Sequence, residues 1–372
     1  EIEKCAIGCE HYADHAASYL RDEVIASDAS RSIVVYQPLG TILCIMPWNF
    51  PFWQLIRAAA PAMMAGNTVI LKHASNVPQC ALALEEAFQQ AGFPTHTFRT
   101  FMISAAQAEQ VIADRRIAAV TLTGSSAAGR KVAAIAGQHL KKCVLELGGS
   151  DPFIVLDDAD IEWTVQQALI ARLQNMGQSC IAAKRFILQE AIADMFVERL
   201  QALINQLRSG DPRDAATTIA PMARMDLRAE LQAQVERSLA LGAKLITGGF
   251  SIGEQGAYYA PTILDHVQPG MPAFDEELFG PVLAIVRVSS VEEAVQLANL
   301  TQFGLGGSLW TGDPARGEAL ARQIHAGCTF VNGIVKSDPR LPFGGIKESG
   351  YGRELSYHGI REFVNIKTIW VR

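Results

Sequence analysis

Charged residues are scarce in this sequence, and they form no block of one sign. They make up 19% of the 372 residues, and 32 lysines and arginines against 38 aspartates and glutamates give a net charge of −6. Without a basic cluster, neither nucleic acid nor an anionic membrane surface is an expected partner. Fixed-period repeats, low-complexity tracts and a signal-peptide pattern are lacking as well. The 49% apolar residues exclude intrinsic disorder, and a length of 372 residues, at roughly 150 per domain, predicts two or three domains.

One long stretch is almost free of charge, because residues 32–71 contain only Arg57. Its length alone would permit a membrane-spanning helix. Pro38, Pro47 and Pro51 would leave backbone groups unpaired in lipid, so buried strands and turns are expected instead, with no membrane partner. The lone guanidinium needs a carboxylate, either from an Asp or Glu of the protein or from a ligand.

Cysteine pairs with disulfide or zinc spacing are missing. The seven cysteines are scattered and include no CxxC pair, which predicts reduced thiols and a cytoplasmic protein. Cys5 and Cys9, and likewise His11 and His15, lie four residues apart in an expected helix. At 3.6 residues per turn the two pairs face apart, so four converging ligands are not expected, and we predict no metal site.

Expected strands and helices alternate along the chain, which predicts the α/β class. Through residue 147 the alternation is typical of a doubly wound sheet, and a second α/β series follows a boundary near Gly148 and Gly149. We expect strands at residues 32–36, 41–46, 67–72, 118–122, 143–147, 153–155, 186–188, 244–247, 281–288 and 308–310. We expect helices at residues 3–22, 52–64, 77–91, 126–137, 160–176, 190–207, 227–241, 291–300 and 314–325.

A thiol and a carboxylate are candidates for covalent chemistry. Cys180 follows the glycine-containing loop 175–179, where backbone N–H groups can favour a thiolate. Its alternative role is that of a small buried hydrophobe. Glu146 lies among aliphatic residues at the end of an expected strand, where desolvation would raise its pKa and suit a general base. Its alternative is a solvated position on an alternating strand.

Three further features could bind anions. The amide of Asn49, in a turn between two prolines, is an uncharged donor for an oxyanion, or else bonds its own backbone. Gly124 and Ser125 follow an expected strand and open a helix, where N–H groups can receive a phosphate, although a plain helix cap is the alternative. Lys72, at the end of a neighbouring strand, would add a cation at the same edge of the sheet.

Together these motifs resemble the aldehyde dehydrogenase superfamily across essentially the whole chain. The matching segments occur in order at residues 47–51, 72, 123–125, 146–149, 177–180, 276–281 and 342–345. Within the superfamily the chain is most similar to the bacterial succinate-semialdehyde dehydrogenases, through residues 71–76, 146–152, 180–186 and 336–342. The chain departs from the family pattern in one respect, because family members carry a substantial further N-terminal stretch. Since the sequence begins at Glu1 within a helix, we expect a processed, trimmed or partial chain.

The resemblance implies a covalent mechanism. Cys180 would attack the aldehyde to give a thiohemiacetal, and Asn49 and the Cys180 N–H would hold the oxyanion. Hydride transfer to the nicotinamide would leave a thioester, which water activated by Glu146 would hydrolyse. Glu277 and Phe279 match positions that hold the nicotinamide ribose and ring, and the cofactor-binding set implied by the resemblance is Trp48, Lys72, Ser75, Gly124, Ser125, Glu277 and Phe279.

Two positions refine the expected cofactor and substrate. Many NAD⁺-preferring relatives have a glutamate at the position of Ser75, where it bonds the ribose hydroxyls and repels a 2′-phosphate. The resemblance therefore implies NADP⁺ as the preferred cofactor, with NAD⁺ possible. Arg57 matches an arginine that meets the distal carboxylate of the substrate, Ser337 matches a serine of the substrate loop, and Arg340 is a weaker candidate beside it.

The resemblance also implies domains and assembly. It places the cofactor domain at residues 1–30 and 39–147, the catalytic domain at 148–345, and oligomerisation strands at 31–38 and 359–372. An apolar exposed strand edge would be a liability in a monomer, so a homodimer or homotetramer is expected.

Three other functions stay open at this point. The chain could oxidise another small aldehyde, with Arg57 paired inside the protein. It could be a cysteine hydrolase or acyltransferase, although no histidine partner lies near Cys180 in the sequence. It could also be a catalytically inactive member of the family with a binding or structural role.

Overall fold

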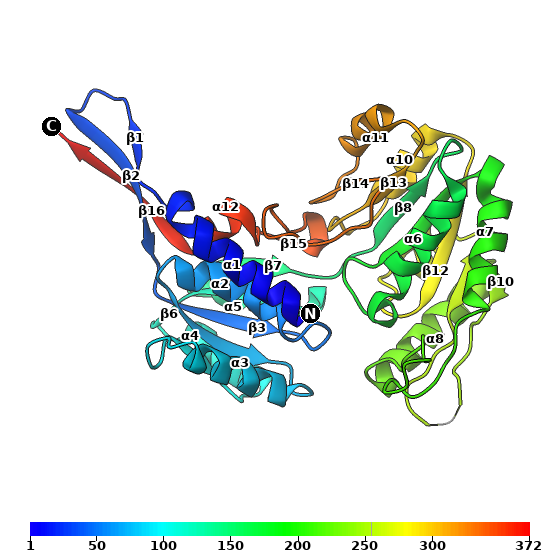
Figure 1. Ribbon diagram of the computed structural model, residues 1–372, viewed down its shortest axis with the longest axis horizontal. Helices are drawn as coiled ribbons and strands as arrows, with labels where there is room; N and C mark the ends of the chain where they lie inside the picture. The colour runs from blue at the N-terminus through cyan, green and yellow to red at the C-terminus, as the bar shows by residue number, and fades with distance from the viewer. Residues whose placement is uncertain (254) are drawn as a thin grey trace. The chain divides into compact units, whose positions relative to one another are not determined.

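The computed structural model describes residues 1–253 and 255–372. The chain divides into two compact units (Figure 1). The first unit contains residues 1–147, 337–345 and 349–372, and the second contains residues 148–336 and 346–348. Residues 337–345, which the sequence-based division put with the catalytic domain, thus pack with the first unit. Within the described residues no helix is long and apolar enough to cross a membrane.

The first unit is built on a six-stranded sheet with the order β15-β7-β6-β3-β4-β5. Strands β3 to β7 are parallel to their neighbours, and β15 pairs antiparallel with β7. The strands are β3 (Thr41–Met46), β4 (Thr68–His73), β5 (Phe98–Thr100), β6 (Ile117–Thr123), β7 (Lys142–Glu146) and β15 (Gly350–Tyr351). The helices are α1 (Ile2–Tyr19), α2 (Trp53–Met64), α3 (Pro78–Gln90), α4 (Ala105–Ala113), α5 (Ser126–Gln138) and α12 (Ser356–Ile360).

This strand order creates a switch point in the first unit. From β3 the chain moves outward through β4 to β5, and it then returns to add β6 and β7 on the other side of β3. Right-handed crossovers therefore put α2 and α3 on one face of the sheet and α5 on the opposite face. The crevice outside the carboxyl ends of β3 and β6 is where such folds bind ligands. The turn that contains Asn49 and the turn at Gly124 both start from these two strand ends.

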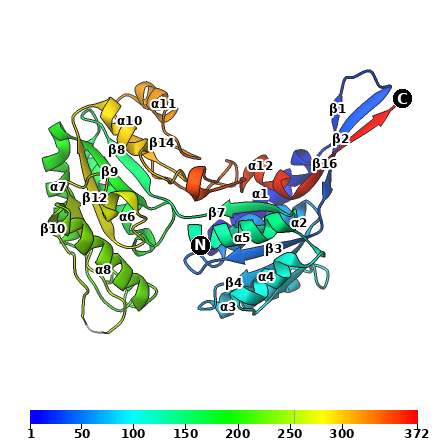
Figure 2. The same ribbon diagram turned by 180° about the vertical axis from the view of Figure 1, so that it is seen from behind.

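A separate three-stranded sheet completes the first unit. It contains β1 (Glu23–Ile25), β2 (Arg31–Pro38) and β16 (Val364–Val371) in the order β1-β2-β16. Strands β2 and β16 pair antiparallel along their full length, as Figure 2 shows at the C-terminus. This pairing ties residues near the two ends of the sequence into one element.

The second unit is built on a seven-stranded sheet with the order β10-β11-β12-β9-β8-β13-β14, in which only the β10–β11 pair is antiparallel. Its strands are β8 (Asp151–Val155), β9 (Ala183–Gln189), β10 (Lys244–Thr247), β11 (Thr262–Asp265), β12 (Val282–Val288), β13 (Ser308–Trp310) and β14 (Phe330–Val331). Its helices are α6 (Ile161–Leu173), α7 (Glu190–Ile204), α8 (Met225–Ala240), α9 (Pro272–Asp275), α10 (Val291–Asn299) and α11 (Pro314–Ala321).

Apolar side chains cover both faces of this second sheet. Successive residues of a strand point to opposite faces, so Ile154 joins one buried cluster while Phe153 and Val155 join the other. The ring of Phe153 lies 5.1 Å from that of Phe186 and 5.1 Å from that of Trp310, measured between centroids. Burial on both faces explains why these strands are continuous apolar runs in the sequence.

The α/β prediction is confirmed, and the main deviations lie at short or irregular elements. The expected strands 41–46 and 244–247 match β3 and β10. Strands β1, β5, β11, β14 and β15 and helices α4, α9 and α12 were not expected, and most of them are too short for a period to be recognised. The helix expected at residues 160–176 ends at Leu173, because Asn175 and Met176 have positive φ angles of 51° and 55°.

Candidate active site

The loop that contains Cys180 lies between the 3₁₀ turn Gln174–Gly177 and β9, in the second unit. Three consecutive residues, Asn175, Met176 and Gly177, have positive φ, so the chain reverses sharply before the cysteine. A side chain at Gly177 would collide with the carbonyl of Gly280. Only glycine fits there, and this close approach fixes the loop against the segment 277–280.

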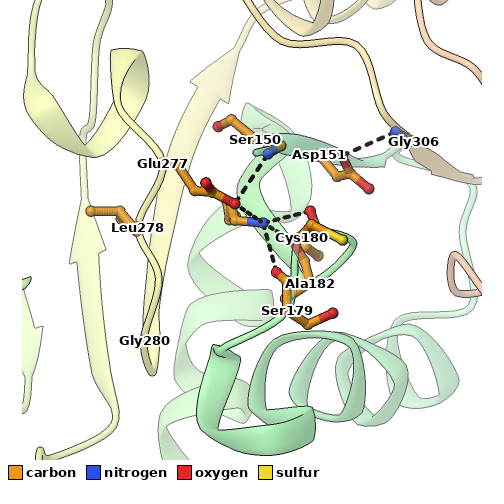
Figure 3. Close-up of polar contacts among 12 residues, drawn as sticks. Ser150, Asp151, Ser179, Cys180, Ala182, Glu277, Leu278, Gly280 and Gly306 are labelled. Atoms are coloured by element: carbon orange, nitrogen blue, oxygen red, sulfur yellow. Dashed lines mark hydrogen bonds and ion pairs between the residues drawn. The ribbon is translucent and has the colours of Figure 1, made fainter. Parts of the chain in front are cut away.

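The ammonium of Lys184 holds the backbone around Cys180. Its Nζ donates to the carbonyls of Ser179 at 3.0 Å, Cys180 at 2.8 Å and Ala182 at 3.1 Å (Figure 3). It also lies 3.6 Å from Oε1 of Glu277. The side chain of Lys184 is fully buried, and burial lowers its pKa, while the Glu277 carboxylate opposes that shift.

Glu277 contacts the segment that leads into β8. Its Oε1 accepts a hydrogen bond from the N–H of Gly149 at 3.0 Å, and its side chain is 20% exposed. A Cβ at Gly148 would collide with Oε2 of Glu277, and one at Gly149 would lie 2.6 Å from the carbonyl oxygen of Cys180. Gly149 is therefore required by the close approach of the Cys180 backbone, and Gly148 leaves room for the Glu277 carboxylate, which Figure 3 shows near Cys180. Burial raises the pKa of Glu277, against the effect of Lys184.

Two other charged side chains fix the surroundings. The guanidinium of Arg172 donates to the carbonyls of Leu278, Gly280 and Ala183, so it joins the end of α6 to the segment that contains Phe279. Burial lowers the pKa of Arg172 to about 9. Asp151 accepts from the N–H of Gly306 at 3.1 Å, and burial raises its pKa to about 6, opposed first by Lys184.

In the first unit, Asn49 is oriented by a neighbour on α2. Its Oδ1 accepts a hydrogen bond from Nε2 of Gln54 at 3.0 Å. An amide whose oxygen is held in this way presents its NH₂ group as the donor. Asn49 and the preceding Trp48 are both half-buried, in the turn that follows β3.

The candidate phosphate-binding residues also lie at the carboxyl edge of the first sheet. Ser125 caps α5, accepting from the N–H of Ala128 at 3.3 Å, and Gly124 next to it is partly exposed. Ser75 is exposed just beyond β4. Lys72, near the end of β4, is half-buried, and burial lowers its pKa. Among the described residues the Lys72 ammonium has no hydrogen bond or ion pair, which suits it to an external phosphate.

Glu146 ends β7 and is 1% exposed. Neither of its carboxylate oxygens has a hydrogen-bond partner among the described residues. Burial, with the nearby Glu354 carboxylate as a smaller cause, raises the pKa of Glu146 to about 8 against the opposing effects of Arg57 and Arg353. A carboxylate with these properties can act as a general base near neutral pH.

Arg57 lies on α2 and is only 4% exposed. It forms an ion pair with Glu354, donates to Oγ1 of Thr123 at 3.3 Å, and stacks over the ring of Phe343 with 4.8 Å to its centroid. The carboxylate that a buried guanidinium needs is therefore present within the first unit. This is the arrangement that the internal-pairing alternative predicts, and an external carboxylate would have to share Arg57 with Glu354.

The other two candidates for substrate binding differ in their surroundings. Ser337 is buried, and its Oγ accepts from Nζ of Lys4 at 2.7 Å and from Nε1 of Trp53 at 3.0 Å. Its own hydroxyl proton can therefore be donated elsewhere. Arg340 is exposed and forms a bidentate pair with Asp338, at 2.8 and 2.6 Å.

Sequence reasoning missed three residues that position these groups, namely Gln54, Lys184 and Glu354. Each acts through a hydrogen bond or ion pair that no local sequence pattern predicts. The one available signal was Arg57, whose isolation required a carboxylate somewhere in the chain. Within the described residues, no group of three or more His, Cys, Asp or Glu side chains could hold a metal ion.

Three features are typical of an α/β enzyme. The first unit has a doubly wound sheet with polar groups at its switch point and a buried carboxylate with a raised pKa, and the second unit has a cysteine loop. Residues 1–369 match the aldehyde dehydrogenase family, and the chain belongs to that family.

Individual relatives agree with this assignment. The chain is 54% identical over 371 residues to a probable NADP⁺-dependent succinate-semialdehyde dehydrogenase of Synechocystis sp., covering 100% of this chain and 82% of that protein. It is 50% identical over 374 residues to an NADP⁺-dependent succinate-semialdehyde dehydrogenase of Mycobacterium bovis, with the same two coverages. The crystal structure of the Streptococcus pyogenes succinic semialdehyde dehydrogenase in complex with NADP⁺ superposes with a TM-score of 0.97 at 40% identity, over 100% of this chain and 81% of that one.

The carboxylate pair generates a prediction about ionisation. Glu354→Gln removes the negative charge that raises the pKa of Glu146 and leaves Arg57 to stabilise the ionised Glu146. We expect Glu146 to titrate near pH 8 in the native protein and at a lower pH in the variant. Infrared difference titration against Glu146→Gln measures this midpoint. The exposed Glu86→Gln serves as the control and should leave it unchanged, and a midpoint that stays or rises in Glu354→Gln contradicts the assignment.

Proposed function

We propose that this protein oxidises succinate semialdehyde to succinate and reduces NADP⁺. The observation that carries the proposal is Glu146, a buried carboxylate whose pKa of about 8 suits a base that deprotonates water. The names of the relatives from Synechocystis sp. and Mycobacterium bovis support the same substrate and cofactor. We further propose a cytoplasmic location, on the basis of the reduced cysteines and the absence of a disulfide among the described residues.

In the first half of the proposed reaction, the thiolate of Cys180 attacks the aldehyde carbon and forms a thiohemiacetal. The turn at residues 175–177 presents the thiol, and the Cys180 N–H together with the amide of Asn49 stabilises the oxyanion. Gln54 supports this assignment, because it occupies the oxygen of the Asn49 amide and leaves the NH₂ group as the donor. Bound NADP⁺ supplies the acceptor for the hydride of the thiohemiacetal carbon.

In the second half, loss of the hydride leaves a thioester on Cys180. Glu146 accepts a proton from water, the resulting hydroxide attacks the thioester carbon, and the C–S bond breaks. The products are the carboxylic acid and the Cys180 thiolate. The Glu146 oxygens have no hydrogen-bond partner in the part of the chain that the structure describes, which supports this role because they are available to a water molecule.

The residues assigned to the cofactor fit NADP⁺. The ammonium of Lys72, which pairs with no residue that the structure describes, and the hydroxyl of Ser75 suit a 2′-phosphate. Ser75 itself carries no negative charge that would repel this phosphate. The N-terminus of α5, at Gly124 and Ser125, suits the pyrophosphate. The partly exposed carboxylate of Glu277 can accept from ribose hydroxyls. We assign Trp48 and Phe279 to apolar contacts with the cofactor.

We also propose that the protein forms a homodimer or homotetramer. Strands β1 and β16 are the two edges of the small sheet, and each has one neighbour among the described strands. The apolar side chains of Val24, Ile366 and Trp370 are exposed on these strands. An exposed apolar edge of this kind favours pairing with a second copy.

The proposed activity is tested by following nicotinamide reduction with succinate semialdehyde and NADP⁺. We expect turnover in the native protein and none in Cys180→Ala, which lacks the nucleophile. Glu146→Gln should keep a single burst of reduced cofactor while steady turnover falls by about 10²-fold or more, because only hydrolysis needs the base. Absence of turnover in the native protein would favour a catalytically inactive member of the family.

Cofactor preference is tested at Ser75. Ser75→Glu places a carboxylate where the 2′-phosphate is proposed to bind, so kcat/KM for NADP⁺ should fall by about 10-fold or more while that for NAD⁺ changes less. Ser75→Gln, which has a similar size but no charge, is the matched control and should have the smaller effect. A native protein that prefers NAD⁺ would contradict the cofactor assignment.

The ion pair of Arg57 with Glu354 favours a second candidate, an enzyme for another small uncharged aldehyde. We assign Arg57, Ser337 and Arg340 to the distal carboxylate of succinate semialdehyde. The double variant Arg57→Met/Glu354→Gln removes both buried charges together and avoids leaving one of them unpaired. If Arg57 binds substrate, KM should rise by about 10-fold or more for succinate semialdehyde but little for butanal. Equal effects on the two aldehydes would favour the second candidate.

A further inference from the structure

Lys184 is a fully buried cation to which the proposed reaction gives no role. It is the second residue of β9 and follows Cys180 by four positions. A lysine removed from water in this way is costly unless its charge and all three of its N–H donors are matched. The groups that pair with the charge and the N–H donors of Lys184 therefore indicate the function of this side chain.

All three donors are used within the turn that contains the nucleophile. The three accepting carbonyls belong to Ser179, Cys180 and Ala182, at 2.8 to 3.1 Å. Carbonyl oxygens repel one another, and they converge on one point here because the ammonium attracts them. The shape of the Cys180 turn therefore depends on this one side chain.

The same ammonium faces the carboxylate assigned to the nicotinamide ribose. Oε1 of Glu277 lies 3.6 Å from Nζ and also accepts from Gly149 at 3.0 Å. The charged and titratable groups that face this position are Glu277, Asp151, Arg172 and the thiol of Cys180. Because Lys184 contacts both the Cys180 turn and Glu277, a displacement of one is transmitted to the other.

We propose that Lys184 is a positioning residue that holds the Cys180 turn and the Glu277 carboxylate in one arrangement. This inference rests on the proposed roles of Cys180 and Glu277. Its positive charge next to the turn also favours the thiolate over the thiol. An uncharged side chain of similar length would remove the one donor that these three carbonyls share, although that of Ser179 also accepts from the N–H of Ala182, and would take the cation away from the Glu277 carboxylate.

The first test measures the thiol directly and needs neither aldehyde nor cofactor. Alkylation of Cys180 by iodoacetamide is followed against pH by peptide mass spectrometry in the native protein and in Lys184→Met. We expect the variant to react about tenfold more slowly near neutral pH, with its profile moved to higher pH. The exposed Cys9, in the other unit, is the internal reference for the reagent.

Arg185→Met is the matched control for loss of a buried cation. Arg185 is the next residue of β9, is equally buried, and donates to the carbonyls of Ser150, Leu297 and Ala298 instead. We expect it to lower the unfolding temperature but to leave the alkylation profile of Cys180 in place. Identical profiles for Lys184→Met and the native protein, or equal changes in both variants, overturn the proposal.

The second test separates positioning from folding. The value of kcat is divided by the number of Cys180 thiols that a thiol reagent can titrate. On this basis Lys184→Met should lose about 10²-fold in kcat, because the nucleophile is displaced. It should also raise KM for NADP⁺, because Glu277 is displaced. A purely structural role would reduce the number of active thiols and leave both constants unchanged. If the native protein oxidises no aldehyde, the proposed function fails, while the alkylation profiles still decide the role of Lys184.

A third measurement covers variants that do not fold. Lys184→Gln keeps two N–H donors and is the substitute for Lys184→Met. If neither folds, the ¹⁵Nζ resonance of Lys184 is followed in the native protein. We expect it to shift when Cys180 is alkylated and again when NADP⁺ is added, and a resonance that moves in neither case overturns the proposal.

Discussion

A charge that is withdrawn from water must be matched by groups of opposite polarity, and this constraint determines the form of the second unit. Arg172, Lys184 and Arg185 are all fully buried there. The partners of all three are mainly main-chain carbonyls, which come from the Cys180 turn, from residues 278–280, from Ser150 and from the end of α10. Because a carbonyl cannot move without its backbone, each cation fixes the path of several loops. The Cys180 turn and the Glu277 segment are positioned by electrostatics, although neither lies in a helix or a strand.

The first unit contains an excess of buried negative charge. Glu146 and Glu354 are both buried, and Arg57 pairs with Glu354, which leaves the Glu146 oxygens without hydrogen-bond partners among the described residues. The pKa of Glu146 is about 8 in the folded chain, above its ordinary 4.5. The folded state therefore favours the protonated form, and the stability that this contributes is lost as the pH rises from 4.5 towards 8. A protein that only had to fold would be more stable with an apolar residue at this position, and a carboxylate here is what the proposed role of Glu146 as a general base requires.

The sequence was most informative where the interactions are local. β3 and β10 were predicted with their exact bounds because their apolar and β-branched residues form short, uninterrupted runs. Cys180 and Glu146 could be selected because glycines and aliphatic neighbours surround them. Lys184 could not, since a lysine in a strand is usually solvated, and its three carbonyl partners belong to an irregular turn that no periodicity identifies. Glu354, the partner of Arg57, lies near the other end of the chain, so no local pattern could identify it. Gln54 was missed because its function depends on the orientation of a single amide.

The two sheets present their functional groups at opposite kinds of edge, and this difference accounts for the buried cations. In the first unit, Asn49, Gly124 and Ser125 follow the carboxyl ends of strands, where the N-terminus of α5 provides a positive field for anions. In the second unit, the segments with Gly149, Cys180 and Glu277 precede β8, β9 and β12, which are adjacent and parallel, so they gather at the amino edge. Helices end at that edge, as α6 does just before the Cys180 loop, and the field at a helix C-terminus is negative. A thiolate would be disfavoured in such a field. Arg172 and Lys184 add positive charge at this edge and offset the negative field at Cys180, the nucleophile that we propose.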